Sequence, residues 1–241
     1  MLLRFWCPVA AISLAAARPT APPPSFPGDF VRHAPVPRTV AERECLSLGD
    51  DLFDATVTPL GACRALGLHD VGRAAGKVWF FGEYQRNWLL TPDDTVAETE
   101  IVLFTSPVPN NADLLRPIWH YRYEQEMLRS VKPQVATVAE GTVLLSIDEC
   151  VNGTGGCSQS FALIGHGSPQ MVMLAFLDSL NRRFPGAIRH GFHVDVQTRR
   201  GSAAVYSDND ANCCPSRIAE FSVRLRRASL ELAALKLRRT D

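Results

Sequence analysis

Six cysteines follow the N-terminal segment of this chain, and their pairing decides which chemistry they can perform. They are Cys45, Cys63, Cys150, Cys157, Cys213 and Cys214. An even number of cysteines in an exported chain predicts structural disulfides. Zinc ligation is the competing chemistry, but the chain has no Cys-x2-Cys pair and no histidine at ligand spacing beside these cysteines. We therefore predict that the six form disulfides, with Cys45 bonded to Cys63.

The adjacent Cys213 and Cys214 leave two pairings open. Neighbouring Cα atoms lie about 3.8 Å apart, which is below the usual disulfide range of about 4.4–6.8 Å, so a bond between them is strained. Either each bonds to Cys150 or Cys157, or Cys150 bonds to Cys157 and a strained vicinal bridge remains. Because a strained bridge is easily reduced, the second pairing would support thiol-redox or metal-handling chemistry at Cys213 and Cys214.

Two loops around these cysteines contain residues that could bind a ligand. The glycines between Cys150 and Cys157 permit positive φ angles, so this loop is either a disulfide-closed hairpin tip or a backbone nest for an anion. Asp208, Asp210 and Asn212 occupy alternate positions, as the first ligands of a calcium loop do. The glycine and distal glutamate of such a loop are missing, so these three are weak metal candidates and turn formation explains them better. We expect no metal and no cofactor.

His166 and Ser168 are the best candidates for nucleophilic catalysis. They lie in a Gly-His-Gly-Ser segment that could form an oxyanion-type loop, which would make the protein an exported hydrolase. The chain has no Gly-x-Ser-x-Gly elbow, and its other histidines are scattered. We therefore assign no catalytic residue and favour a protein that is not an enzyme.

The two cysteine loops also resemble those of a known group of proteins. The motifs Asn-Gly-Thr-Gly-Gly-Cys (152–157) and Asp-Ala-Asn-Cys-Cys-Pro-Ser (210–216) are similar to a signature of uncharacterised exported bacterial proteins, including some lipoproteins of actinobacterial type. The similarity covers residues 140 to 226 or so. It implies a bacterial, exported protein and no particular activity. The chain departs from the lipoproteins because large and charged residues precede Cys7 where a lipobox has small ones.

The N-terminal segment predicts export. Residues 1–17 combine Arg4, an apolar stretch and the small residues Ala15 to Ala17, as a cleavable signal peptide does. Residues 18–38 are rich in proline and predict an extended leader outside the core. Beyond the N-terminus no run of about 18 apolar residues predicts a membrane span. We therefore expect a periplasmic or secreted protein without a transmembrane segment in its mature chain.

The rest of the chain predicts an α+β protein dominated by an antiparallel β meander. Short runs of aromatic and β-branched residues begin at Lys77, and turn-prone segments separate them. The expected strands are 78–81, 100–104, 118–123, 142–147, 159–164, 192–196, 201–206 and 221–225. Residues 230–237 predict either a last strand or a short helix.

Helices are expected at three places. Ser168 and Pro169 precede apolar residues at helical spacing, which predicts one amphipathic helix over about 169–183. Thr39 and Glu42 form a capping box that predicts a short helix ending near Leu46. A second short N-terminal helix is expected to begin at Pro59.

Composition limits the remaining possibilities for domains and partners. Lys plus Arg equal Asp plus Glu at 25 each, so the sequence offers no overall positive field for nucleic acid. Residues 39–241 predict a single disulfide-stapled domain, with a possible boundary near 135. The leading hypothesis is a non-enzymatic binding or envelope-associated module whose partner is an unknown protein or small-molecule ligand.

Overall fold

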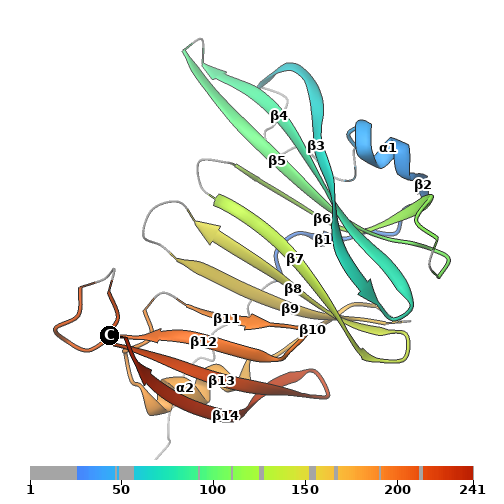
Figure 1. The fold of residues 1–241 in the computed structure, drawn as a ribbon. Coiled ribbons are helices and arrows are strands. Elements are labelled where there is room, and N and C mark those ends of the chain that lie inside the picture. The colour runs from blue at the N-terminus through green and yellow to red at the C-terminus, as the bar shows by residue number, and fades with distance from the viewer. Residues whose placement is uncertain are drawn as a thin grey trace, which may run out of the picture.

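The computed structural model describes residues 26–46, 48, 57–91, 93–109, 111–124, 128–151, 156–165, 168–189, 191–211 and 214–240, without the side chains of 128 and 129. The predicted signal peptide lies outside these residues, as do residues 18–25 of the predicted leader. Within them the protein is α+β and mainly antiparallel β, as predicted. The described strands form three sheets, which follow one another down the molecule in Figure 1.

The N-terminal sheet is a meander in which each long strand pairs with the next. Two short strands pair with its last long strand. Its strands are β1 (Asp29–Phe30), β2 (Val36–Pro37), β3 (Thr58–Ala74), β4 (Lys77–Thr91), β5 (Asp94–Thr105) and β6 (Leu114–Glu124). Because side chains alternate between the faces of a strand, this sheet has two distinct surfaces to cover.

The middle and C-terminal sheets are also antiparallel and consecutive in sequence. The middle sheet contains β7 (Leu128–Ala139), β8 (Thr142–Val151), β9 (Cys157–Ile164) and β10 (Gln170–Met171). The C-terminal sheet contains β11 (Phe192–Asp195), β12 (Arg200–Val205), β13 (Arg217–Arg226) and β14 (Ser229–Arg239). Residues 230–237, for which the sequence predicts a strand or a short helix, therefore belong to strand β14.

Three apolar clusters hold the layers together. One face of the N-terminal sheet packs against the middle sheet, with Trp119 and Leu145 at the contact. Its other face is covered by the short helix α1 (Arg38–Arg43), whose Ala41 is buried. The second face of the middle sheet packs against helix α2 (Ala175–Arg183) and the C-terminal sheet, with Phe161 and Phe176 in the cluster. The middle sheet is thus buried on both faces.

The helix predicted over 169–183 is shorter in the structure. Only Ala175–Arg183 is helical, and its N-cap is Leu174, which makes no side-chain capping bond. Residues 170 and 171 instead form β10, which pairs with β9, and the Val172 N–H donates to the Phe161 carbonyl. The prediction failed at this end because the free edge of β9 offers hydrogen bonds that outcompete the first helical turn.

The predicted N-terminal helices are also only partly correct. The first begins at Arg38 after Pro37, and no side chain caps it, so the predicted capping box at Thr39 is wrong. The second helix, expected from Pro59, does not form, because Thr58–Ala74 is the 17-residue strand β3. Pro59 is accommodated because β3 is an edge strand and the proline stands at its start.

Part of the predicted leader belongs to the fold. Phe26 and Phe30 pack against the cluster between the N-terminal and middle sheets, and the Trp119 indole donates to the Pro27 carbonyl at 2.8 Å. Phe26 and Pro27 therefore contact Trp119, and β1 and β2 add to the N-terminal sheet by pairing with β6. Of the described helices, none has both the length and the apolar character needed to cross a membrane.

Candidate functional site

The C-terminal sheet has one buried face and one solvent-facing face. Ala203, Phe221 and Val223 point into the cluster shared with α2. Strand alternation therefore places Arg200, Ser202 and Ala204 of β12 on the opposite face, together with the register partners Ser222, Glu220 and Ile218 of β13. We call this surface the outer face. The buried face packs against the core, so only the outer face could contact a ligand.

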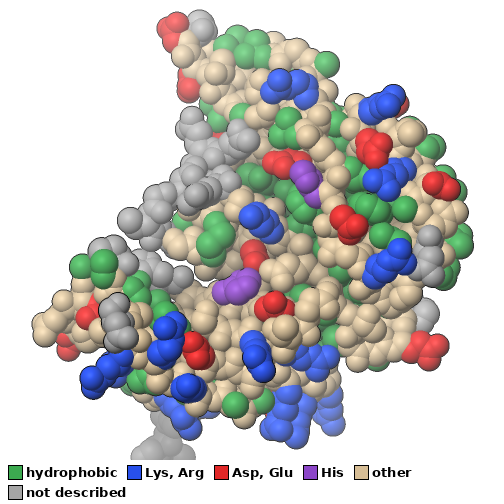
Figure 2. Space-filling model, viewed as in Figure 1, with side chains coloured by type: hydrophobic (Ala, Val, Ile, Leu, Met, Phe, Trp, Pro, Cys, Tyr) green, Lys and Arg blue, Asp and Glu red, His purple; other side chains and the backbone are tan. Residues whose placement is uncertain are grey.

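The outer face belongs to the basic part of an otherwise neutral chain. Residues 182–241 contain twelve Lys and Arg against six Asp and Glu, whereas the whole chain has 25 of each kind. Figure 2 shows Lys and Arg side chains gathered over the C-terminal sheet, at the lower part of the molecule. A local surplus of this kind attracts anions even when the net charge is zero.

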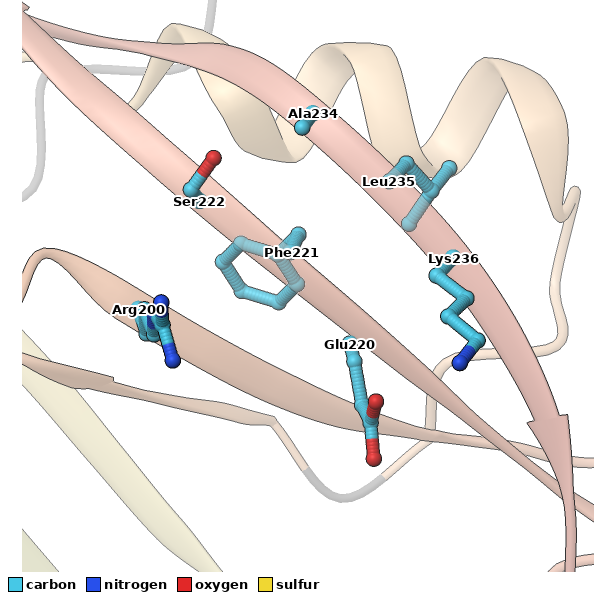
Figure 3. Close-up of a pocket in the computed structure, with 7 residues that line it drawn as sticks. All are labelled: Arg200, Glu220, Phe221, Ser222, Ala234, Leu235 and Lys236. Atoms are coloured by element: carbon cyan, nitrogen blue, oxygen red, sulfur yellow. The ribbon is translucent and has the colours of Figure 1, made fainter.

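Two cations flank a hollow of about 290 Å³ in this face, which we call the basic hollow. Its lining consists of Arg200, Glu220, Phe221, Ser222, Ala234, Leu235 and Lys236. In Figure 3 Arg200 lies on β12 and Lys236 on β14, with Glu220, Phe221 and Ser222 on β13 between them. An anion in the hollow would therefore meet positive charge from two sides.

Arg200 and Lys236 differ from the other cations of the outer face in having no ion pair with a described residue. Arg238 contacts Glu220 at 3.0 Å. Arg224 and Arg226 both contact Glu231, at 3.4 and 3.6 Å. The two cations at the basic hollow are therefore available to an external anion.

A β-bulge shapes the basic hollow. Ser222 pairs with Ala234 while Val223 pairs with Leu232, so Ala233 is an extra residue on β14. A bulge of this kind bends the strand and increases its twist. The alanine opposite Ser222 leaves room that a longer side chain would fill. The hollow is thus a consequence of the register shift and of the small residue beside it.

A second hollow of about 400 Å³ lies beside the Cys150–Cys157 disulfide, and we call it the disulfide hollow. Its apolar lining includes Cys157, Phe192, Ala204, Pro215 and Ile218. His193 and Ser202 contribute polar side chains. The hollow brings together the two loops that the cysteines marked in the sequence, since Cys157 ends one loop and Pro215 belongs to the other.

The disulfides resolve part of the predicted pairing. Cys45 bonds to Cys63, as predicted, with Cα atoms 6.0 Å apart. Cys150 bonds to Cys157 across the β8–β9 hairpin, so the alternative in which these two cross-link to Cys213 and Cys214 is wrong. Cys214 is exposed, and Cys213 lies outside the described residues, so redox chemistry at this pair stays a prediction.

A glycine fixes the approach between the disulfide and β11. Gly191 has φ +81°, and a Cβ there would collide with the Cys157 carbonyl oxygen. Only glycine combines this backbone angle with this closeness. The wall of the disulfide hollow is therefore set by backbone contact.

A polar network joins the middle sheet to the C-terminal sheet beneath the disulfide hollow. Gln159, 5% exposed, donates to the Asp148 carboxylate at 2.7 Å and to the Val194 carbonyl at 2.8 Å, and accepts from the Val194 N–H at 2.8 Å. Asp148 also receives a bond from Gln134 and lies 3.5 Å from the Nδ1 of His193. Burial raises the pKa of the Asp148 carboxyl, and the bond from Gln159 and the nearby His193 oppose that rise.

Asp148 and Glu149, neighbours in sequence, do not form a carboxylate pair. Asp148 faces Gln159 and His193, whereas Glu149 lies against Tyr121 of the N-terminal sheet, where it adds to the rise that burial causes in the pKa of Tyr121. His193 stands opposite Ser202 in the strand register, but no hydrogen bond joins these described side chains.

The structure describes only some of the predicted calcium and hydrolase residues. Asp210 receives hydrogen bonds from the backbone and hydroxyl of Ser207 and the backbone of Ser216, so it closes its own loop. Asp208 is exposed, Asn212 lies outside the described residues, and no metal-binding cluster of side chains exists in the described part of the chain. Ser168 is exposed and His166 lies outside the described residues, so a hydrolase site there stays a prediction.

Another cluster of charges is buried in the N-terminal sheet and lines neither hollow. It consists of Glu98, Glu100, His120 and Arg122, each less than a tenth exposed. Arg122 contacts both carboxylates, and His120 contacts Glu100 at 3.2 Å. The charged groups of this cluster contact one another inside the sheet.

Comparison with known proteins gives no family. No family model matches the chain, and neither a curated protein nor a solved structure matches it. The resemblance to exported bacterial proteins therefore stays a prediction.

The residues of the basic hollow were missed in the sequence. The whole chain has equal numbers of basic and acidic residues, so the total charge does not show the surplus of cations after residue 181. Counting charged residues in the C-terminal quarter alone shows it. Lys236 and Arg238 alternate on β14, as cations on one strand face do, but residues 230–237 predict a short helix as readily as a strand. The register that places Arg200 across from Ser222 cannot be read from one strand alone.

Proposed function

We propose that this protein is a non-enzymatic binding module of a periplasmic or secreted compartment, and that its ligand carries a carboxylate or phosphate bound by Arg200 and Lys236. The observation that carries the proposal is a pair of cations on either side of the basic hollow that form no ion pair with any residue in the described part of the chain. Two disulfides fit an oxidising location. The Ser222 hydroxyl in the same hollow adds a donor for the anion.

Binding of inorganic phosphate to the full mature chain tests the site. In an NMR titration at low salt, we expect saturable shifts of the amides in β12, β13 and β14 around the hollow. The double variant Arg200→Gln with Lys236→Gln should weaken binding about tenfold or more, because charged hydrogen bonds to an anion are lost.

A matched control separates a site from diffuse attraction. Arg224→Gln with Arg226→Gln removes the same charge from the same face, but these arginines pair with Glu231 and do not line the hollow. This variant should lose much less phosphate affinity than the double variant at the hollow, because its arginines are paired with Glu231 and do not line the hollow. Equal losses in both variants, or no saturable binding, would overturn the proposal.

Glu220 provides a test in the opposite direction. Its carboxylate lines the basic hollow and is paired with Arg238, so it opposes an incoming anion. Glu220→Gln keeps the shape and removes the negative charge. We expect phosphate to bind several-fold more tightly to this variant at low salt, by about 0.5–1 kcal/mol for a partly exposed charge. Unchanged or weaker binding would place the anion elsewhere.

A further inference from the structure

The two hollows are continuous along one strand. Arg200 lines the basic hollow, and Ser202 and Ala204 line the disulfide hollow on the same face of β12. On the neighbouring β13, Glu220 and Ile218 repeat this order. Same-face residues two apart on a strand are about 7 Å apart, so Arg200 and Ala204 lie about 13 Å from each other. A single small molecule can therefore reach both hollows.

The two hollows differ in chemistry. The basic hollow has two cations, whereas the disulfide hollow is lined mainly by apolar groups, with Ala204, Pro215 and Ile218 among them. Its volume of about 400 Å³ falls within the range of about 300–1,000 Å³ that is typical of small-molecule sites. A ligand that fits both places has a charged end and an apolar body.

The walls of the disulfide hollow are fixed before any ligand arrives. The Cys150–Cys157 bond and the close approach of Gly191 hold one side. The hydrogen bonds that Asp210 accepts from Ser207 and Ser216 hold the loop that carries Pro215. A site that is already ordered loses little entropy when it binds.

We propose that the ligand is a monomeric anionic amphiphile. Its carboxylate or phosphate lies between Arg200 and Lys236, and its alkyl or acyl chain runs along β12 toward Ile218 and Pro215. This inference rests on the proposed function, because it uses the same two cations. It adds that affinity increases with chain length, by up to about fourfold for each methylene that is fully buried.

Acetate and octanoate are the probes, because they share a carboxylate and differ in chain length. Titrated into the full mature chain below the micelle concentration of octanoate, octanoate should bind about a hundredfold more tightly than acetate. Amides of residues 202–204 and 216–218, at the disulfide hollow, should shift with octanoate and not with acetate. Acetate binding with no gain for octanoate overturns this inference and leaves the proposed function standing.

Variants separate the two ends of the ligand. Ile218→Thr keeps a β-branched side chain and Ala204→Leu fills the hollow, so each should abolish most of the gain for octanoate while acetate binds as before. Leu60→Thr, at an exposed leucine of β3, is the matched control and should change neither ligand. Circular dichroism of each variant checks its fold.

The remaining outcomes decide against the inference in different ways. Loss of both acetate and octanoate binding in Arg200→Gln with Lys236→Gln is expected. Octanoate binding that survives this double variant would mean nonspecific apolar contact and overturn both proposals. Cosedimentation with phosphatidylglycerol vesicles, without tighter octanoate binding, would assign the basic face to a membrane surface and overturn the monomeric ligand.

Discussion

At the scale of single residues, Arg122 neutralises two carboxylates inside the N-terminal sheet. Its guanidinium contacts Glu98 at 3.5 Å and Glu100 at 3.3 Å, and the indole of Trp88 donates to Glu98 at 2.6 Å. Charges this deeply buried are tolerated only when they are paired. The cluster therefore depends on each of its members.

Replacing Arg122 should be among the most damaging single changes in this protein. Arg122→Met removes the guanidinium that contacts both buried carboxylates, and we expect a loss of about 3–5 kcal/mol in the free energy of unfolding. Urea unfolding measures it. The triple variant that adds Glu98→Gln and Glu100→Gln should recover much of the loss. A loss below about 1 kcal/mol in the single variant would mean that water reaches the cluster.

Asp210 gives stability that depends on pH. Hydrogen bonds from the Ser207 side chain and backbone and from Ser216 hold its pKa well below the usual value of 3.8. Because the folded-state pKa is depressed, this stabilisation is complete above 3.8 and is lost as the pH falls toward the folded value. Asp210→Asn should therefore lower the Tm at pH 7, with a difference that shrinks as the solution is acidified below 3.8. A difference that stays constant with pH would contradict this origin.

At the scale of elements, the side chain of Gln159 attaches β11 to the middle sheet. Its amide forms two hydrogen bonds with the backbone of Val194, much as a neighbouring strand would. Gln159→Met keeps the volume and leaves both backbone groups of Val194 unpaired, so we expect a loss of about 2–4 kcal/mol. Amide exchange of Val194 should accelerate in the variant. Gln134→Met, which removes a bond to Asp148 alone, is the control and should cost less.

A strand is predictable from sequence when its own residues are aromatic or β-branched. A strand that forms only because it pairs with a neighbour is not predictable in this way. The aromatic residues of β4 and β6 correctly predict strands at 78–81 and 118–123. β7 was missed because it contains Lys132 and Pro133, and it tolerates the proline because it is an edge strand. The helix expected from Pro59 is wrong because the residues of β3 do not alternate between apolar and polar side chains. This segment is a strand because it pairs with β4. The strands β4, β5 and β8 are therefore predictable from their own residues, whereas β3 and β7 are defined by pairing with a neighbouring strand.

The candidate site was predictable only in part. The cysteines marked both loops of the disulfide hollow, and the Cys150–Cys157 bond closes one of them. The cations of the basic hollow come from β12 and β14, which are separated by β13, so no sequence spacing could show that Arg200 and Lys236 face one hollow.

At the scale of the whole molecule, the predicted single domain can be tested by unfolding. One apolar cluster includes Trp119 and Tyr123 on one side of residue 135 and Val143 and Leu145 on the other. We expect tryptophan fluorescence, which reports the N-terminal sheet, and hydrogen exchange of β12 and β13 to show one common transition in denaturant. Two separated transitions would instead divide the chain. Reduction of the Cys45–Cys63 bond should lower the free energy of unfolding by about 3 kcal/mol in the chain-entropy model, and the common midpoint should fall with it.

The bonds from Gln159 close one edge of the C-terminal sheet, and among the described strands only β13 pairs along residues 231–239 of β14. That open edge carries Lys236, Arg238 and Arg239, so two molecules approaching edge to edge repel each other. Added salt should therefore promote association of the protein, because it screens this repulsion. Light scattering should show particles growing between 0.1 and 1 M sodium chloride, as the screening length falls from about 10 to about 3 Å. A Lys236→Glu variant should behave differently, because mixed charges along the edge would draw molecules together already at low ionic strength.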